Sequence, residues 1–405
     1  MKKLAFLLLL ISFGSAIFSQ NKEVVNAWRY HDNGKLEKAK EAIDKATVHE
    51  KTRDDAKTWY YRGNIYIDIH RSEEFKNLDE NALDKAYEAY KKARELDEKE
   101  NYVNDINQAM LFVGQEFFNR GANKFNEGMS ALEVQDSTVA QQEFTKSMQS
   151  FETAHEIYSE AEIMDTLTIY YVSVAAELAG KYDKAKEKLL LLNEMNYDKP
   201  TIYTSLANIY YRHENNVEKA LEVYNEGREK FPGDLNLLLN QTNLFLAEEM
   251  TEKALDNLQL AAEIDTTNPT IFFAIGAKYN EVVDDTTRNL EMRNNAFEKA
   301  AVAYDRAIEL NPDYFDPNYN MGALYVNKAS SLIDRANQLP LDEQEEYDRL
   351  INEANEYLKK SLPYLEKALE LQPQDRSTMI SLKEIYTRLN MMEKLKEINA
   401  KLESN

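Results

Sequence analysis

Histidines have the most adaptable side-chain chemistry in this chain, and their spacing does not fit a reaction centre. The five are His31, His49, His70, His155 and His213. No two of them form the HExxH pattern of a helical zinc site, and the sequence has no Cys that could close a structural zinc site. We therefore expect no metal ion and assign the histidines to scattered surface or partly packed positions.

Phosphate-binding and nucleophile motifs are also absent from the sequence. The glycines never cluster into GxGxxG or into the loop that ends in Gly-Lys-Ser or Gly-Lys-Thr, so neither route to nucleotide binding is available. There is no G-x-S-x-G nucleophile elbow and no calcium-binding loop of the EF-hand type. Asp and Glu together number 71, so a close carboxylate pair is expected by coincidence. We expect no catalytic residue, no cofactor and no enzymatic activity.

The charge balance excludes a large class of partners. The 405 residues carry a formal net charge of -22. Nucleic-acid binding depends on Lys and Arg that neutralise phosphates, so such an acidic chain is not expected to bind nucleic acid. The acidic excess is better explained as a solvated surface that keeps a long chain soluble.

The N-terminus has the pattern of a secretory signal. Lys2 and Lys3 precede a short apolar run, and small residues follow up to Ser19. We expect residues 1–19 to be removed and the mature chain to be exported, to the periplasm or to an extracellular or outer-envelope location. No later apolar run reaches the roughly 20 residues of a membrane-spanning helix. We therefore expect no transmembrane segment after cleavage, and peripheral attachment to a membrane is compatible with this expectation.

An internal repeat organises the rest of the chain. Ala185, Ala220 and Ala254 lie 35 and 34 residues apart, and each of them directly follows a Lys. Small residues also recur midway along the preceding helix, and prolines recur at the exits, as in Ala207, Ala220, Gly227 and Pro232. Small side chains at these positions let two helix axes approach closely, while bulky neighbours such as Tyr304 fill the adjacent grooves.

This pattern resembles the tetratricopeptide repeat (TPR), whose period is about 34 residues. The resemblance implies an all-α, right-handed superhelical solenoid of about nine TPR-like helix pairs, several of them elongated. We divide the chain into four segments. Residues 1–19 are a signal peptide, and residues 20–158 are N-terminal TPR-like repeats with elongated hairpins. Residues 165–312 are regular TPR repeats, and residues 313–405 are C-terminal TPR-like repeats with a long helical hairpin and a capping helix.

The longest departure from the period lies between Ala307 and Ala368, which are 61 residues apart. Apolar residues keep helical spacing on both sides of Pro340, so the extra residues predict a helical hairpin about twice the usual length. Asp342 with Glu345 three residues later predicts a capping box that starts the returning helix. Shorter additions are expected near 71–81, near 126–143, and between Ala254 and Ala300.

The resemblance also implies a binding surface. In TPR proteins the first helix of each pair lines a concave groove that holds a peptide. Aromatic and amide side chains occupy the corresponding positions here: Tyr60, Asn64, Tyr170, Asn208, Tyr211, Asn243, Phe273 and Tyr319. The amides could hydrogen-bond a peptide backbone and the rings could supply rigid contact area. Simple packing between helices is the alternative explanation for each ring.

Two functions remain open at this stage. The first is an exported scaffold that binds proteins or peptides of a secretion or assembly system in the cell envelope, because stacked helix pairs extend a continuous surface without a new core. The alternative is a module that binds glycan or peptidoglycan fragments, since sugar rings stack on aromatic side chains.

Overall fold

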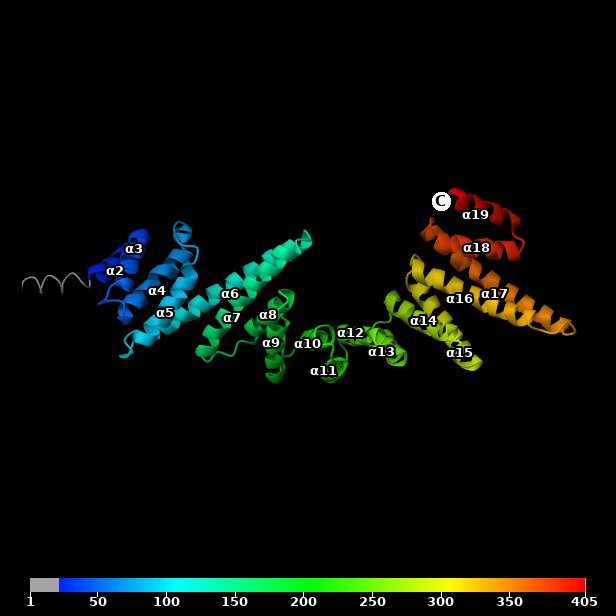
Figure 1. Cartoon of the computed structure of the whole chain (residues 1–405), viewed down its shortest axis with the longest axis horizontal. Coiled ribbons are helices and arrows are strands. Elements are labelled where there is room, and N and C mark those ends of the chain that lie inside the picture. Colours follow the sequence, from blue (N-terminus) through cyan, green and yellow to red (C-terminus); the bar gives the residue numbers. More distant parts are fainter. Residues whose placement is uncertain (1–21, 405) are drawn as a thin grey trace, which may run out of the picture. The chain divides into compact units, whose positions relative to one another are not determined.

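The computed structural model describes residues 22–404, so the predicted signal peptide at 1–19 lies outside the described residues. Within this range the chain forms 18 α-helices and one short 3₁₀ helix, with no strand (Figure 1). In chain order the 18 helices between residues 22 and 404 form nine successive pairs. The predicted fold class, an all-α solenoid of helix pairs, is therefore confirmed.

By their internal contacts the residues form two compact units, which meet between Ala220 and Leu221. The first unit contains α2 (Lys22–Asp32), α3 (Leu36–Val48), α4 (Ala56–Arg71), η1 (Lys76–Leu78), α5 (Ala82–Leu96), α6 (Val103–Glu133), α7 (Ser137–Glu160), α8 (Thr166–Leu178), α9 (Tyr182–Glu194) and α10 (Thr201–Arg212). The boundary falls within α11 (Val217–Lys230). The second unit continues with α12 (Leu235–Ala247), α13 (Thr251–Ile264), α14 (Pro269–Asp284), α15 (Leu290–Leu310), α16 (Phe315–Asn337), α17 (Gln344–Leu371), α18 (Arg376–Arg388) and α19 (Met392–Ser404). The sequence analysis divided the repeats into three segments by the length of each repeat, whereas these two units are defined by contacts. The three segments therefore stay a prediction.

Within each unit, helices that follow one another in the sequence pack together. In the first unit α4 packs on α5, and α5 then packs on α6. In the second unit the same alternation runs from α12 through α19. No helix between residues 22 and 404 combines the length and the apolar character that crossing a membrane would require.

Glycines on first helices receive large side chains from second helices, as the repeat pattern predicts. A Cβ added at Gly63 would lie 2.4 Å from the Tyr90 ring, and one added at Gly276 would lie 2.5 Å from the Tyr304 ring. Both rings are about 1% exposed or less. The small residues therefore permit close helix crossings, which confirms the packing role assigned to them.

The third pair, α6 and α7, has a register of its own. Gly114, Gly121 and Gly128 recur every seven residues on α6, and each faces a ring on α7. The rings belong to Tyr158, Phe151 and Phe144, which recur at the same interval in the opposite direction. The residues added to this repeat therefore extend both helices in one regular antiparallel contact.

The turns inside helix pairs use residues in left-handed conformation. Gly34 and Gly180 have φ of 67° and 70°, so the predicted turn glycines are confirmed. Asn215, Glu249 and Asn390 occupy the corresponding turns with φ of 51°, 55° and 57°. Between pairs, Pro269 is the first residue of α14, where its missing amide hydrogen costs nothing.

The long C-terminal hairpin consists of α16 and α17, and its prediction is confirmed. Ala329, Leu332 and Ala336 on α16 share a buried cluster with residues of α17. The helix α17 is continuous through Pro363. The predicted capping box is wrong, because α17 begins at Gln344 and its N-cap residue, Glu343, makes no side-chain capping bond. In the second repeat the added residues form the loop that contains η1.

Candidate binding surfaces

The predicted groove residues all lie on first helices of their pairs. In the first unit α4 carries Tyr60 and Asn64, α8 carries Tyr170, and α10 carries Asn208 and Tyr211. In the second unit Asn243 lies on α12, Phe273 on α14 and Tyr319 on α16. All are half-buried except Asn243, which is exposed. Their role in binding a peptide stays a prediction.

Three of the five aromatic groove residues, Tyr60, Tyr170 and Phe273, contact a second ring that lies between helix pairs. Tyr60 stacks on Tyr102 at 4.9 Å between ring centroids, just before α6 begins. In the same way Tyr170 lies 5.8 Å from Tyr197 and Phe273 lies 5.5 Å from Tyr314. We call these three contacts the joint pairs: Tyr60–Tyr102, Tyr170–Tyr197 and Phe273–Tyr314. All six rings are half-buried, so each pair packs across a joint and still presents aromatic surface.

Tyr319 differs from the three rings of the joint pairs that lie on first helices. It stacks on Phe315 of its own helix at 5.7 Å between ring centroids. The sequence did not predict the joint partners, because they lie in connections between helices and do not follow helical periodicity. Their signal is an aromatic residue within the few residues before a first helix.

The first joint pair also has a polar side. The Tyr60 hydroxyl donates a hydrogen bond to Oδ2 of Asp105 over 3.4 Å. Burial raises the pKa of Tyr60, a hydrogen bond from Asn64 lowers it, and the negative charge of Asp105 raises it again. Asn64 is also held from the other side, since its Oδ1 accepts a hydrogen bond from the Tyr90 hydroxyl at 2.7 Å. The amide thus links α4 to the buried ring on α5.

A lysine that the sequence did not single out lies beside the second joint pair. Nζ of Lys199 is 4.9 Å from the Tyr170 ring centroid and 5.9 Å from that of Tyr197. The Lys199 side chain is exposed. It supplies a positive charge from the connection before α10.

Four of the histidines pair with a carboxylate, stack on an aromatic ring or are partly buried. His31 lies 2.7 Å from Asp68 and His70 lies 3.2 Å from Glu116. His213 stacks on Tyr182, and burial followed by the charge of Lys188 lowers the pKa of His155. Within the described residues no group of three or more His, Asp or Glu side chains is arranged to hold a metal ion.

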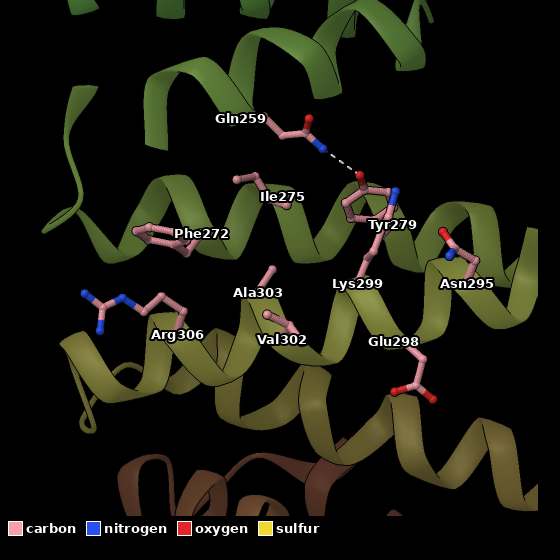
Figure 2. A pocket seen from close by; sticks show the side chains of 10 residues that line it. All are labelled: Gln259, Phe272, Ile275, Tyr279, Asn295, Glu298, Lys299, Val302, Ala303 and Arg306. Carbon is pink, nitrogen blue, oxygen red and sulfur yellow. Dashed lines mark hydrogen bonds between the residues drawn. The ribbon is translucent and has the colours of Figure 1, made fainter. Parts of the chain in front are cut away.

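A second surface lies between α13, α14 and α15, where a hollow of about 570 Å³ opens (Figure 2). Phe272, Ile275 and Tyr279 of α14 line it, and Gln259 of α13 donates to the Tyr279 hydroxyl over 2.7 Å. Because these α14 residues recur at intervals of three and four, they share one helix face, and Phe273 points away from it. The hollow is therefore separate from the predicted groove.

Comparison with known proteins relates part of the chain to a family. Residues 289–328 match the family model described as TPR repeat, and they span α15 and the first part of α16. No curated protein matches the chain in sequence. The match and the nine helix pairs together support a TPR protein.

Three solved structures illustrate the similarity. The MamA crystal structure is 19% identical, covers 48% of this chain and 93% of its own, and has a TM-score of 0.32. YrrB, described as a TPR protein with an unusual peptide-binding site, is 18% identical over 48% of this chain and 88% of its own, with a TM-score of 0.33. A thermophilic TPR protein of Thermus thermophilus, TTC0263, is 17% identical over 50% of this chain and 98% of its own, with a TM-score of 0.31.

Proposed function

We propose that the protein is an exported scaffold that binds peptides or proteins of a cell-envelope secretion or assembly system along its first helices. The observation that carries this proposal is the recurrence of the joint pairs, which place half-buried aromatic rings at equivalent positions of separate repeats. We assign the surface a binding role and no catalytic role.

Aromatic rings that are already fixed by a neighbour favour binding, because their side chains lose little conformational entropy when a peptide packs on them. Each ring of a joint pair is already fixed by its partner, so a peptide that packs on it immobilises few additional side chains. Tyrosine also offers a hydroxyl for hydrogen bonding next to its apolar face. Within one unit, repetition along the stacked helices lets several weak contacts act on one extended segment.

The second joint pair gives the proposal its chemical preference. Lys199 is exposed and lies over Tyr170, so a carboxylate of the bound segment could contact the ammonium group while its neighbours pack on the ring. We propose that this part of the surface prefers segments in which an acidic side chain or a chain terminus adjoins an apolar or aromatic residue.

Photo-crosslinking in intact envelopes tests the scaffold function. A photoreactive amino acid placed at Asn208 or Tyr211 of α10 should capture a reproducible partner from either position. The yield should fall about tenfold when Tyr170→Ala and Lys199→Ala are combined, as expected when contacts at the centre of an interface are removed. Lys99→Ala is the matched control, because Lys99 is also an exposed lysine between helix pairs and should not change the yield. No partner, or equal yields in all variants, contradicts the proposal.

Export is tested separately. Cell fractionation with mass spectrometry of the mature N-terminus should find the chain outside the inner membrane and lacking residues 1–19. An intact N-terminus in the cytoplasmic fraction contradicts this part of the proposal and leaves the binding surface to be judged by the crosslinking result.

Glycan binding is the second candidate, and the half-buried tyrosine rings favour it because sugars stack on such faces. Calorimetry with peptidoglycan fragments distinguishes the two functions. Heat of binding that disappears in Tyr211→Ala supports the glycan module, and absence of binding leaves the peptide scaffold.

A further inference from the structure

One face of α15 is an exposed stripe that no other helix of the second unit covers. Glu291, Asn295, Glu298 and Val302 are all exposed and Arg306 is partly exposed, and their spacing of three or four residues places them in one row. Val302 is 71% exposed, although it is a β-branched apolar residue in the middle of a polar row. Val302 is not isolated, because it lines the hollow together with Phe272 and Ile275, and an apolar patch bordered by charged residues is typical of an interaction surface.

The stripe borders a continuous groove. The hollow of about 570 Å³ and a second one of about 520 Å³ share Tyr279 and Asn295 as lining residues. Figure 2 shows the first of them, with Val302 and Ala303 of α15 on one side and Phe272 and Ile275 of α14 on the other. The same surface therefore offers an apolar projection and an apolar recess side by side.

The charges along the stripe are complementary to those of a second copy of α15 that runs in the opposite direction. If two copies of α15 pair antiparallel about a two-fold axis midway between residues 298 and 299, Glu298 of each copy faces Lys299 of the other. In the same register Glu291 faces Arg306 of the other copy. A parallel, in-register pair would instead place every charge opposite its like, which is unfavourable.

The apolar residues fit the same register. Val302 falls opposite Asn295 of the second copy, and the turn before Asn295 presents Met292, whose side chain is 46% exposed. Both Asn295 and Met292 line the second hollow. The projecting valine of each copy thus meets the recess of the other, as a two-fold interface requires.

We propose that this face binds a second copy of the chain, through antiparallel contact of the two α15 helices. The groove carries Arg288, Lys299 and Arg306 together with Glu252, Glu291 and Glu298, so its charges balance and attract neither an acidic nor a basic partner. A second, antiparallel copy of the same helix, by contrast, places an opposite charge against each of these charges on α15. The contact goes beyond the peptide scaffold, and it uses the face of α14 opposite to Phe273.

Charge exchange at the axis tests the register. Sedimentation equilibrium of the mature chain should show a reversible dimer. E298K alone and K299E alone each place two like-charged pairs at the axis, so each should weaken the dimer by about tenfold or more. An equimolar mixture of the two variants should recover association, because every pair is then opposite in sign, and the double variant E298K/K299E should recover it as well.

Two controls keep the outcome interpretable. E356K and K359E change an exposed pair on α17 in the same way and should leave the association unchanged. Far-ultraviolet circular dichroism should show unchanged helix content in every variant. A monomeric wild-type chain at all accessible concentrations, or a dimer that is indifferent to E298K and K299E, overturns the proposal.

A disulfide provides an independent measure of the contact. Since the chain has no cysteine, E298C introduces a single thiol next to the proposed axis. It should form a disulfide-linked dimer under mild oxidation, whereas E356C should not. Equal cross-linking of both variants contradicts the assigned register.

Discussion

The Tyr90 hydroxyl donates a hydrogen bond to Oδ1 of Asn64 over 2.7 Å, next to the point where its ring covers Gly63. The corresponding ring on α15, Tyr304, covers Gly276 in the same way. The residue after Gly276 is Ala277, which offers no acceptor where the other repeat has Asn64. The Tyr304 hydroxyl is consequently buried without a hydrogen-bond partner. Burial raises the pKa of Tyr304, with smaller contributions from Asp284 and Glu281.

The two tyrosines should therefore respond differently to loss of the hydroxyl. Tyr90→Phe removes a satisfied buried hydrogen bond and should lower the free energy of unfolding by about 1 kcal/mol. Tyr304→Phe removes a hydroxyl that is buried without a partner and should be neutral or stabilising. Equilibrium urea unfolding of the full chain measures both values. An equal loss in the two variants would contradict the assignment.

Supplying the missing acceptor should complete the relationship. Ala277→Asn places on α14 the amide that α4 has in Asn64, and it should stabilise the chain by about 0.5–1.5 kcal/mol through a new bond with Tyr304. The gain should disappear when Ala277→Asn is combined with Tyr304→Phe, which a double-mutant cycle measures directly. A gain that persists without the hydroxyl would have another cause.

The sequence could predict the features that depend on local residue preferences, and it missed those that depend on how helix pairs stack. The helix pairs, the turn glycines such as Gly34 and the joint prolines such as Pro269 follow from local preferences, which each residue expresses wherever it stands. The joint partner Tyr102 lies in a connection, and its contact with Tyr60 depends on how successive pairs stack. The capping prediction failed for a related reason: Asp342 has a suitable residue type, but the turn after Pro340 makes the next residue, Glu343, the N-cap.

The register of α6 and α7 was hidden because its period is seven and not 34. It makes a sharp prediction for Gly121, where an added Cβ would lie 2.8 Å from Phe151. Gly121→Ala must displace a fully buried ring and should cost about 1–3 kcal/mol of stability. Gly233→Ala is the control, because a Cβ there meets no atom within 4 Å. Thermal unfolding followed by circular dichroism should separate them, and similar melting temperatures would argue against the close helix contact.

The turn between α12 and α13 should be improved by glycine. Glu249 adopts φ of 55°, a left-handed conformation that strains a residue with a side chain. Glu249→Gly should stabilise the chain by about 0.5–1 kcal/mol. Glu248→Gly, at φ of -94°, has no strain to relieve and should be destabilising because glycine gains freedom in the unfolded chain. Urea midpoints of the two variants should move in opposite directions; a shift in the same direction contradicts the proposed relief of strain.

His155 should make stability depend on pH in one window. Burial lowers its pKa below the ordinary 6.5, Lys188 lowers it further, and Asp165, Glu152 and Glu156 raise it. Its Nδ1 is buried without a hydrogen-bond partner. As the pH falls below 6.5, the unfolded chain takes up a proton that the folded chain binds less well. The folded state therefore loses stability from about pH 6.5 down to the folded pKa, and His155 makes no such contribution above that window.

Replacing the imidazole should flatten this part of the profile. His155→Gln keeps a polar side chain without a titrating group, so its unfolding free energy should change less between pH 7 and pH 5 than that of the parent chain. His49→Gln is the matched control, because it removes an exposed imidazole by the same substitution. Urea unfolding at a series of pH values measures the slopes. If the profile of His155→Gln stayed parallel to that of the parent chain throughout this range, burial of the imidazole would not be the cause of the acid sensitivity.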